Sequence, residues 1–218
     1  MKLKYSTLLF DLDGTLTDSG EGIINCVLYA LEHFGIHETD ESLLNSFIGP
    51  PLYHSFKRWY PQFSEEDIQQ AMRFYRERYQ TDGMFENRVY DGIYALLDSL
   101  RAAGYRLVIA TAKPEHFTWP IVRHFELDRR FDLLYGCIES IGRLDKADVI
   151  RHLLSVNPDM NSENTIMIGD RDHDVIGAAK NGLDCIGVLY GFGDRQELTN
   201  AGAKYIAETV DELRQLLL

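Results

Sequence analysis

The stretch Thr7-Leu8-Leu9-Phe10-Asp11-Leu12-Asp13-Gly14 decides how this sequence folds at its start. Residues 5–10 form a short apolar run, which predicts a buried strand that ends at the acidic turn. Asp11 and Asp13 would share one face of a regular strand, but Gly14 bends the chain, so both carboxylates can flank one reacting group. One carboxylate can then act as a nucleophile while the other, partly protonated beside its charged neighbour, transfers protons.

Apolar runs alternate with helical patterns along the second half of the chain. This alternation predicts an α/β fold with a parallel sheet. The strands are expected at residues 107–110, 133–135, 165–168, 185–189 and 205–206.

Two helices between and after these strands have clear sequence signals. Apolar residues at 93, 96, 97 and 100 follow helical spacing, and Gly104 is the expected stop. Thr209 and Glu212 form the pattern of a capping box ahead of the last apolar residues. Both helices are therefore expected to cover the sheet.

The stretch from about residue 18 to residue 83 has helical periodicity and no convincing strand, which predicts a helical insert. The run Ile48-Gly49-Pro50-Pro51-Leu52 divides it, because the prolines cannot continue a helix and can only begin the next one. The expected domains are therefore a core of residues 1–17 and 84–218 and a helical domain of residues 18–83.

Polar residues follow several of the predicted strands, at the sheet edge where open α/β folds bind ligands. They are Asp11 and Asp13, Thr111, Lys146 at the start of a helix, and Asp170 with Asp174. Transfer of a phosphoryl group to a carboxylate needs cations and fixed donors. Asp170, Asp11 and the Asp13 carbonyl can supply the oxygen ligands that Mg²⁺ prefers, Lys146 can neutralise charge, and the Thr111 hydroxyl and the backbone amides after it can hold phosphate oxygens.

These residues resemble the four motifs of the haloacid dehalogenase superfamily: DLDGTLTD, Thr111 in ATAKP, Lys146 in LDKADVI, and GDRDHD. The resemblance implies a Rossmann-like core with helices on both faces and a small helical cap inserted after the first strand. It implies Asp11 as nucleophile, Asp13 as general acid/base, and Lys146 as a further catalytic residue. Thr111, Ala112 and Lys146 would bind substrate. Mg²⁺ would be held by Asp11, Asp13 and Asp170, with support from Asp174.

The insert and the ATAKPE segment are most similar to phosphoglycolate phosphatase-like proteins, some of which act as 5'-nucleotidases. This resemblance implies a phosphatase for a small phosphorylated metabolite such as phosphoglycolate or a nucleoside 5'-monophosphate. The approach to Lys146 through Gly142-Arg143-Leu144-Asp145 departs from the expected basic or hydroxylated pattern. A phosphomutase similar to β-phosphoglucomutase and a phospho-aspartate receiver domain remain alternatives.

Composition restricts the partners. The net charge of −12 opposes nucleic-acid binding, and the absence of a long apolar run argues against a membrane span, so a cytoplasmic location is expected. Three cysteines without CxxC spacing predict core residues. Asp172 and His173 are expected to be solvated loop residues. Whether the chain is a monomer or a homodimer stays open.

Overall fold

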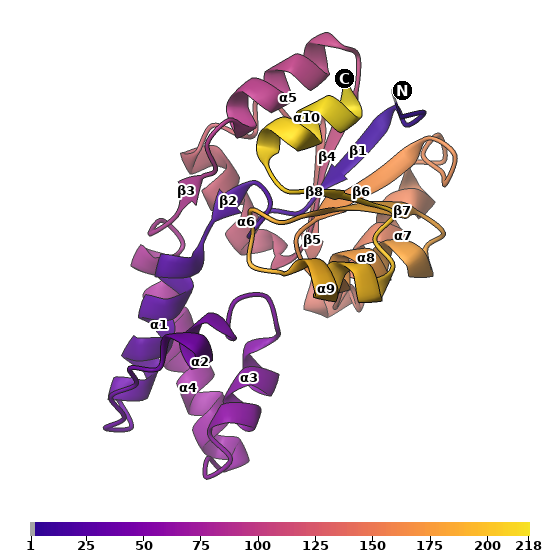
Figure 1. The fold of residues 1–218 in the computed structure, drawn as a ribbon. Coiled ribbons are helices and arrows are strands. Elements are labelled where there is room, and N and C mark those ends of the chain that lie inside the picture. Colours follow the sequence, from indigo (N-terminus) through magenta and orange to yellow (C-terminus); the bar gives the residue numbers. More distant parts are fainter. Residues whose placement is uncertain (1–2) are drawn as a thin grey trace. The chain divides into compact units, whose positions relative to one another are not determined.

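The computed structural model describes residues 3–218, and the chain divides into two compact units (Figure 1). The sheet unit consists of Met1–Thr17 and Val89–Leu218, and the helical unit consists of Asp18–Arg88. Among the described residues, no helix is both long and apolar enough to cross a bilayer.

A parallel six-stranded sheet forms the centre of the sheet unit. Its order is β5 (Leu133–Cys137), β4 (Arg106–Pro114), β1 (Thr7–Phe10), β6 (Thr165–Gly169), β7 (Asp184–Val188) and β8 (Tyr205–Ala207). The chain builds outward from β1 through β4 to β5, then crosses back to β6. The carboxyl ends of β4, β1 and β6 therefore lie at a topological switch point, where such sheets bind ligands. The predicted α/β fold is confirmed.

Helices cover both faces of this sheet (Figure 1). One face carries α5 (Ile93–Ala102) and α10 (Val210–Leu217), and the other carries α7 (Lys146–Val156), α8 (Asp172–Lys180) and α9 (Arg195–Ala201). Helix α6 (Glu115–His124) packs on β4 and β5, and a 3₁₀ turn, η2 (Glu139–Ile141), precedes α7. The spaced apolar residues of α5 are all buried, which explains why this segment folds onto the sheet as a helix.

Strand β1 is buried along its whole length. Its flanking strands are parallel to it in matching register, with Phe10 beside Ile109 of β4 and Ile168 of β6. Because of this register, Asp11 follows β1 at the level of Ala110 in β4 and Gly169 in β6, at the carboxyl edge of the sheet. The core thus sets the position of the first acidic residue.

The last helix shows half of the predicted capping box. The Thr209 side chain accepts a hydrogen bond from the Glu212 backbone amide at 3.1 Å. The Glu212 carboxylate, however, accepts from the amide of Glu208 at 2.8 Å and not from that of Thr209. The reciprocal bond has moved by one residue, so the cap still satisfies two backbone donors.

The helical unit contains α1 (Gly20–Glu32), α2 (Glu41–Asn45), α3 (Leu52–Trp59), α4 (Glu65–Arg78) and the π-turn η1 (Tyr79–Gly83). Helix α4 packs against α1 and α3. It begins with a full capping box between Ser64 and Asp67. Helix α3 starts directly after Pro51, as the proline pair predicts.

The chain leaves the sheet unit at β2 (Thr17–Asp18) and returns at β3 (Arg88–Val89), and these two short strands pair with each other. Residues 84–88 group with the helical unit, five residues beyond the expected insert of 18–83. Glu86 explains this grouping: its carboxylate pairs with Arg78 at 2.7 Å, and its carbonyl accepts from the Gly22 amide at 3.0 Å. The role of this unit as a cap stays a prediction.

Candidate active site

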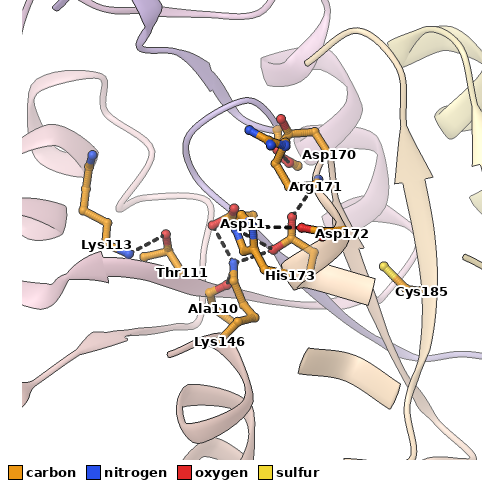
Figure 2. Close-up of polar contacts among 12 residues, drawn as sticks. Asp11, Ala110, Thr111, Lys113, Lys146, Asp170, Arg171, Asp172, His173 and Cys185 are labelled. Atoms are coloured by element: carbon orange, nitrogen blue, oxygen red, sulfur yellow. Dashed lines mark hydrogen bonds and ion pairs between the residues drawn. The ribbon is translucent and has the colours of Figure 1, made fainter. Parts of the chain in front are cut away.

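Lys146 is the centre of the polar cluster at the carboxyl edge of the sheet (Figure 2). Its side chain is 2% exposed, and its Nζ lies 2.7 Å from Asp11 Oδ1 and 2.7 Å from Asp174 Oδ1. It also donates a hydrogen bond to the Ala110 carbonyl at 2.9 Å. Burial alone would lower the pKa of Lys146, but the negative charges of Asp11 and Asp174 outweigh it and raise this pKa. The ammonium therefore stays charged between two carboxylates.

Local sequence explains how Lys146 reaches this position. Asp145 caps α7 by accepting a hydrogen bond from the Asp148 amide at 2.8 Å, so the helix begins at Lys146. The stem of Lys146 then passes over Gly177 of α8, where a Cβ atom would lie 2.7 Å from Lys146 Cγ. Only glycine leaves room for the lysine stem at that point.

Asp170 is fully buried directly after β6. Its carboxylate accepts from the Thr15 hydroxyl at 3.2 Å and from the Phe192 amide at 2.9 Å. Burial raises the pKa of Asp170 well above its usual value, and the nearby charges of Asp174 and Asp11 raise it further. Gly14 permits this approach, because its φ is 79° and a Cβ atom there would lie 2.1 Å from Asp170 Oδ2.

Asp174, also fully buried, lies on α8 and differs from Asp170 in its electrostatics. Burial alone would raise the pKa of Asp174, but the positive charge of Lys146 outweighs this effect and lowers the pKa. The Arg171 amide donates to the same carboxylate at 3.1 Å. Lys146 thus keeps Asp174 ionised. Asp170 lies near the negative charges of Asp174 and Asp11, and among residues 3–218 it has no ion pair with a lysine.

Asp13 has a partner that sequence reasoning missed. The ammonium of Lys113 forms an ion pair with Asp13 Oδ2, and the lysine side chain is only 9% exposed. The other carboxylate oxygen, Asp13 Oδ1, is buried and has no hydrogen-bond partner among residues 3–218. Lys113 stands two residues after Thr111 in the ATAKP motif, so its position in that motif was the available signal.

Thr111 and Ala112 lie inside β4, which runs on to Pro114, and not after a strand ending at Ala110 as expected. The pairing of β4 with β5 shifts register between Ala110 and Pro114, so this end of the strand is irregular. The Thr111 hydroxyl accepts a hydrogen bond from the Lys113 amide at 3.2 Å (Figure 2). Ala112 packs against the core.

His173 is not the solvated loop residue that the sequence predicts. It lies in the first turn of α8 with its side chain one-third exposed, and Asp172 begins the same helix. A nitrogen of the His173 ring and one oxygen each of Asp11 and Asp174 all lie within 4.8 Å of one another. The Arg171 side chain and the Asp172 amide both donate to Glu197 Oε1, at 2.7 and 2.9 Å, and these bonds hold the start of α8 directly before His173.

The donor set fits a hard divalent cation. The fully buried Lys146 pairs with the carboxylates of Asp11 and Asp174, and no ion pair joins it to Asp170 among residues 3–218, so three carboxylates and one lysine leave an excess of negative charge among these four side chains. Burial raises the pKa of Asp170, and the negative charges of Asp174 and Asp11 raise it further. A cation with oxygen ligands would offset it, and Mg²⁺ takes a few carboxylates while it keeps several waters.

The sequence matches the family model described as haloacid dehalogenase-like hydrolase over residues 8–188. The chain belongs to this family. The match includes Asp11, Asp13, Thr111, Lys146, Asp170 and Asp174. The predicted resemblance is therefore confirmed, and so is the expectation of a hydrolase.

Relatives cover almost the whole chain. A 5'-nucleotidase from Pseudomonas aeruginosa is 46% identical over 99% of this chain and 96% of its own length. A protein from Mycobacterium tuberculosis named tyrosine-protein kinase PtkA is 37% identical over 96% of this chain and 72% of its own length. A phosphoglycolate phosphatase from Colwellia psychrerythraea is 28% identical over 98% of this chain and 97% of its own length.

A solved structure agrees with the fold. The crystal structure of a predicted phosphatase from Clostridium acetobutylicum superposes with a TM-score of 0.88 at 51% identity, covering 97% of each chain. Because identity and coverage are both high, the likeness extends to the whole chain and not only to the sheet.

Proposed function

We propose that this chain is a magnesium-dependent phosphatase that hydrolyses a small phosphomonoester through a phospho-aspartate at Asp11. The observation that carries the proposal is the buried Lys146 ammonium, 2.7 Å from both Asp11 and Asp174. Its positive charge faces the carboxylate of Asp11 and would offset the charge that an incoming phosphate brings. An anionic nucleophile can then approach an anionic substrate.

Asp11 is the proposed nucleophile because it follows the central strand and is 4% exposed. Asp13 is the proposed general acid/base, since its Oδ1 has no partner within residues 3–218 and can exchange a proton with a leaving oxygen or a water. Thr111 and Ala112, with Lys146, would hold the phosphate oxygens. Lys113, which forms an ion pair with Asp13, would orient that carboxylate.

Asp11, the Asp13 carbonyl and Asp170 would hold Mg²⁺, with Asp174 in support. When bound, the ion would supply charge neutralisation to the transferred phosphoryl group. The Thr15 hydroxyl and the Phe192 amide fix the orientation of Asp170, so the ligand would be in place before the ion arrives. The His173 ring, beside Asp11 and Asp174, would border this site.

The proposed substrates are nucleoside 5'-monophosphates and phosphoglycolate. The relative named 5'-nucleotidase supports the first class at 46% identity, and the one named phosphoglycolate phosphatase supports the second at 28%. The greater identity favours a nucleoside monophosphate. The cap role predicted for the helical unit belongs to this proposal, as the part that would select among such esters.

A panel of phosphate esters with Mg²⁺ tests the proposal. Wild type is expected to release phosphate from at least one nucleoside monophosphate or phosphoglycolate, and Asp11→Asn is expected to lose activity by at least about 1,000-fold. Asp211→Asn, on the surface of α10, is the matched control and should retain activity. Acid-quenched wild type should carry phosphate on the peptide that contains Asp11.

Four outcomes would contradict the proposal. Release of no phosphate from any ester would exclude a phosphatase for these substrates. Full activity of Asp11→Asn would exclude the phospho-aspartate. Turnover that depends on a sugar bisphosphate and yields little free phosphate would indicate a phosphomutase, and a stable phosphoprotein without turnover would indicate a receiver-like protein.

A further inference from the structure

A second ion pair with a buried cation lies in the sheet unit, outside the cluster around Lys146, and its carboxylate partner is partly exposed. Arg143 is 4% exposed, and its Nη2 donates to Glu115 Oε2. The same carboxylate oxygen accepts from the Gly136 amide at 3.2 Å. Glu115 begins α6 directly after β4, and Gly136 belongs to β5. One carboxylate therefore joins the end of β4, the end of β5 and the segment before α7.

The first consequence concerns the irregular end of β4, which carries Thr111 and Lys113. A Cβ atom at Gly136 would lie 2.7 Å from the Lys113 carbonyl oxygen and 2.9 Å from Glu115 Cα. The chain therefore passes over β5 at a distance that only glycine allows. The register of β4 and β5 shifts between Ala110 and Pro114, and the Glu115 carboxylate adds a bond from the Gly136 amide that joins the two strands at this irregular segment.

The second consequence concerns Lys146. Ile138 and Arg143 exchange backbone hydrogen bonds of 2.9 and 3.1 Å, which close a short hairpin over Gly142, whose φ is 72°. Three residues after Arg143, helix α7 begins at Lys146. The guanidinium thus attaches the hairpin that leads into Lys146 to the strand end that carries Thr111 and Lys113.

The chemistry of the pair indicates positioning more than stability. Burying a guanidinium costs desolvation free energy, and its interaction with a carboxylate only partly offsets this cost. An apolar pair of the same volume would stabilise the fold equally well. Arg143 Nε is buried and has no hydrogen-bond partner within residues 3–218, which adds to this cost. A guanidinium, however, has a rigid planar fork that fixes direction in a way that an ammonium does not.

We propose that Glu115 and Arg143 form a positioning pair that holds the Thr111–Lys113 segment in register with Lys146. The inference rests on the proposed function, because these segments would contact the transferred phosphoryl group from two sides. Neither Glu115 nor Arg143 is a catalytic residue; both act through the residues they hold. We expect the pair to stabilise the transition state more than the bound substrate, because the phosphoryl oxygens of the transition state need hydrogen-bond donors at fixed distances.

The test compares Glu115→Gln, Arg143→Lys and the double variant with wild type, using the best ester of the panel and Mg²⁺. Each single variant is expected to lower kcat by about tenfold or more, with a change in KM of less than about threefold. Inhibition by orthovanadate, a mimic of the transition state, should weaken in parallel with kcat. The double variant should be no worse than the worse single variant, because the pair acts as one unit.

Arg130→Lys and Asp98→Asn provide the matched control. Arg130 Nε lies 2.8 Å from Asp98 Oδ1 in the same unit, and its side chain is 23% exposed. These variants should keep kcat and vanadate inhibition within about twofold of wild type. Thermal unfolding of every variant shows whether activity was measured on folded protein, and the nearly isosteric Glu115→Gln is the variant expected to fold in every case.

Several results would overturn the inference. One is a kcat within twofold of wild type for folded Glu115→Gln. Another is a loss of kcat in the double variant that equals the combined losses of Glu115→Gln and Arg143→Lys. A third is a loss of activity with unchanged vanadate inhibition, which is what a structural role alone would produce. Failure of the proposed function is distinguishable, because then wild type itself would release no phosphate.

Discussion

The buried ammonium of Lys146 offsets the charge of two carboxylates. It is among the largest fully buried side chains, yet it carries a charge. Two carboxylates and a carbonyl surround its ammonium, so its desolvation is offset by contacts at 2.7 and 2.9 Å. Removal of this lysine would leave Asp11 and Asp174 facing each other without a cation.

At the opposite edge of the sheet, Asp184 ties β1 to β7. Its carboxylate accepts from the Tyr5 hydroxyl and pairs with Lys204 at 2.6 Å. Burial alone would raise the pKa of Asp184, but the bonds from Lys204 and Tyr5 outweigh it and lower the pKa. The same surroundings, burial first and then the bond to Asp184, raise the pKa of Tyr5 to about 12.

The lowered pKa of Asp184 predicts how the stability of the fold changes as the solution becomes acidic. A folded-state pKa below the unfolded value of about 3.9 stabilises the fold above that pH, and the stabilisation disappears as the pH falls through the folded pKa. Asp184→Asn should therefore have a lower Tm than wild type at about pH 6, and the difference should shrink toward about pH 3. Thermal unfolding across this range checks it. An equal Tm difference at every pH would show that packing, and not ionisation, is responsible.

On the scale of elements, the crossing of α7 and α8 predicts the effect of Gly177→Ala. Alanine normally stabilises a helix by about 1 kcal/mol relative to glycine. Here the added methyl would lie 2.7 Å from Lys146 Cγ and 3.2 Å from the Ala147 amide nitrogen. We expect a lower Tm and at least about a tenfold loss of kcat, because Lys146 must shift from Asp11.

Ile176→Ala on the same helix is the control for this prediction. Ile176 is 40% exposed, so its truncation should leave kcat unchanged. Unfolding curves and kinetics on both variants provide the comparison. A Gly177→Ala protein with raised Tm and normal activity would show that the lysine stem adapts without moving its ammonium.

The cap of α10 supports a separate prediction. Thr209→Ala removes the hydroxyl that accepts from the Glu212 amide at 3.1 Å. The expected loss is about 1 kcal/mol in the free energy of unfolding, with unchanged kcat, since this cap contacts none of the cluster residues. Urea unfolding measures it. Thr199→Ala, an exposed position inside α9, is the control and should cost less than the cap variant.

For the whole molecule, the buried acidic cluster predicts a response to metal. A ligand that binds only the folded state adds about 2.7 kcal/mol at 100 times its Kd. Mg²⁺ should therefore raise the Tm of wild type above the value in sodium chloride of equal ionic strength. Asp170→Asn should lose most of this increase, because Asp170 is the carboxylate without a close lysine. An equal increase in both proteins would place the ion elsewhere.

Local sequence patterns predicted the strands and helices of this chain, but not the exact boundary between its two units. Apolar periodicity predicted the parallel sheet, the helices α5 and α10, and the division at Pro51, because burial of one face is a local property of the chain. Boundaries were less predictable. Residues 84–88 join the helical unit through Glu86, which pairs with Arg78 eight residues earlier and accepts a hydrogen bond from Gly22, far away in the sequence.

By itself, the sequence determined the residue types at the carboxyl edge of the sheet. Asp11 and Asp170 come directly after β1 and β6, Thr111 lies in the last part of β4, and Lys146 and Asp174 lie in the first turns of α7 and α8. Register follows from the hydrophobic pattern, so these positions were readable in advance. Only the tertiary structure decided which side chains pair. Lys113 with Asp13, His173 beside Asp11, and Arg143 with Glu115 each join segments whose distance along the chain carries no signal. An ion pair forms where folding brings two distant strands or helices together, and a local sequence pattern does not specify which distant side chains become neighbours.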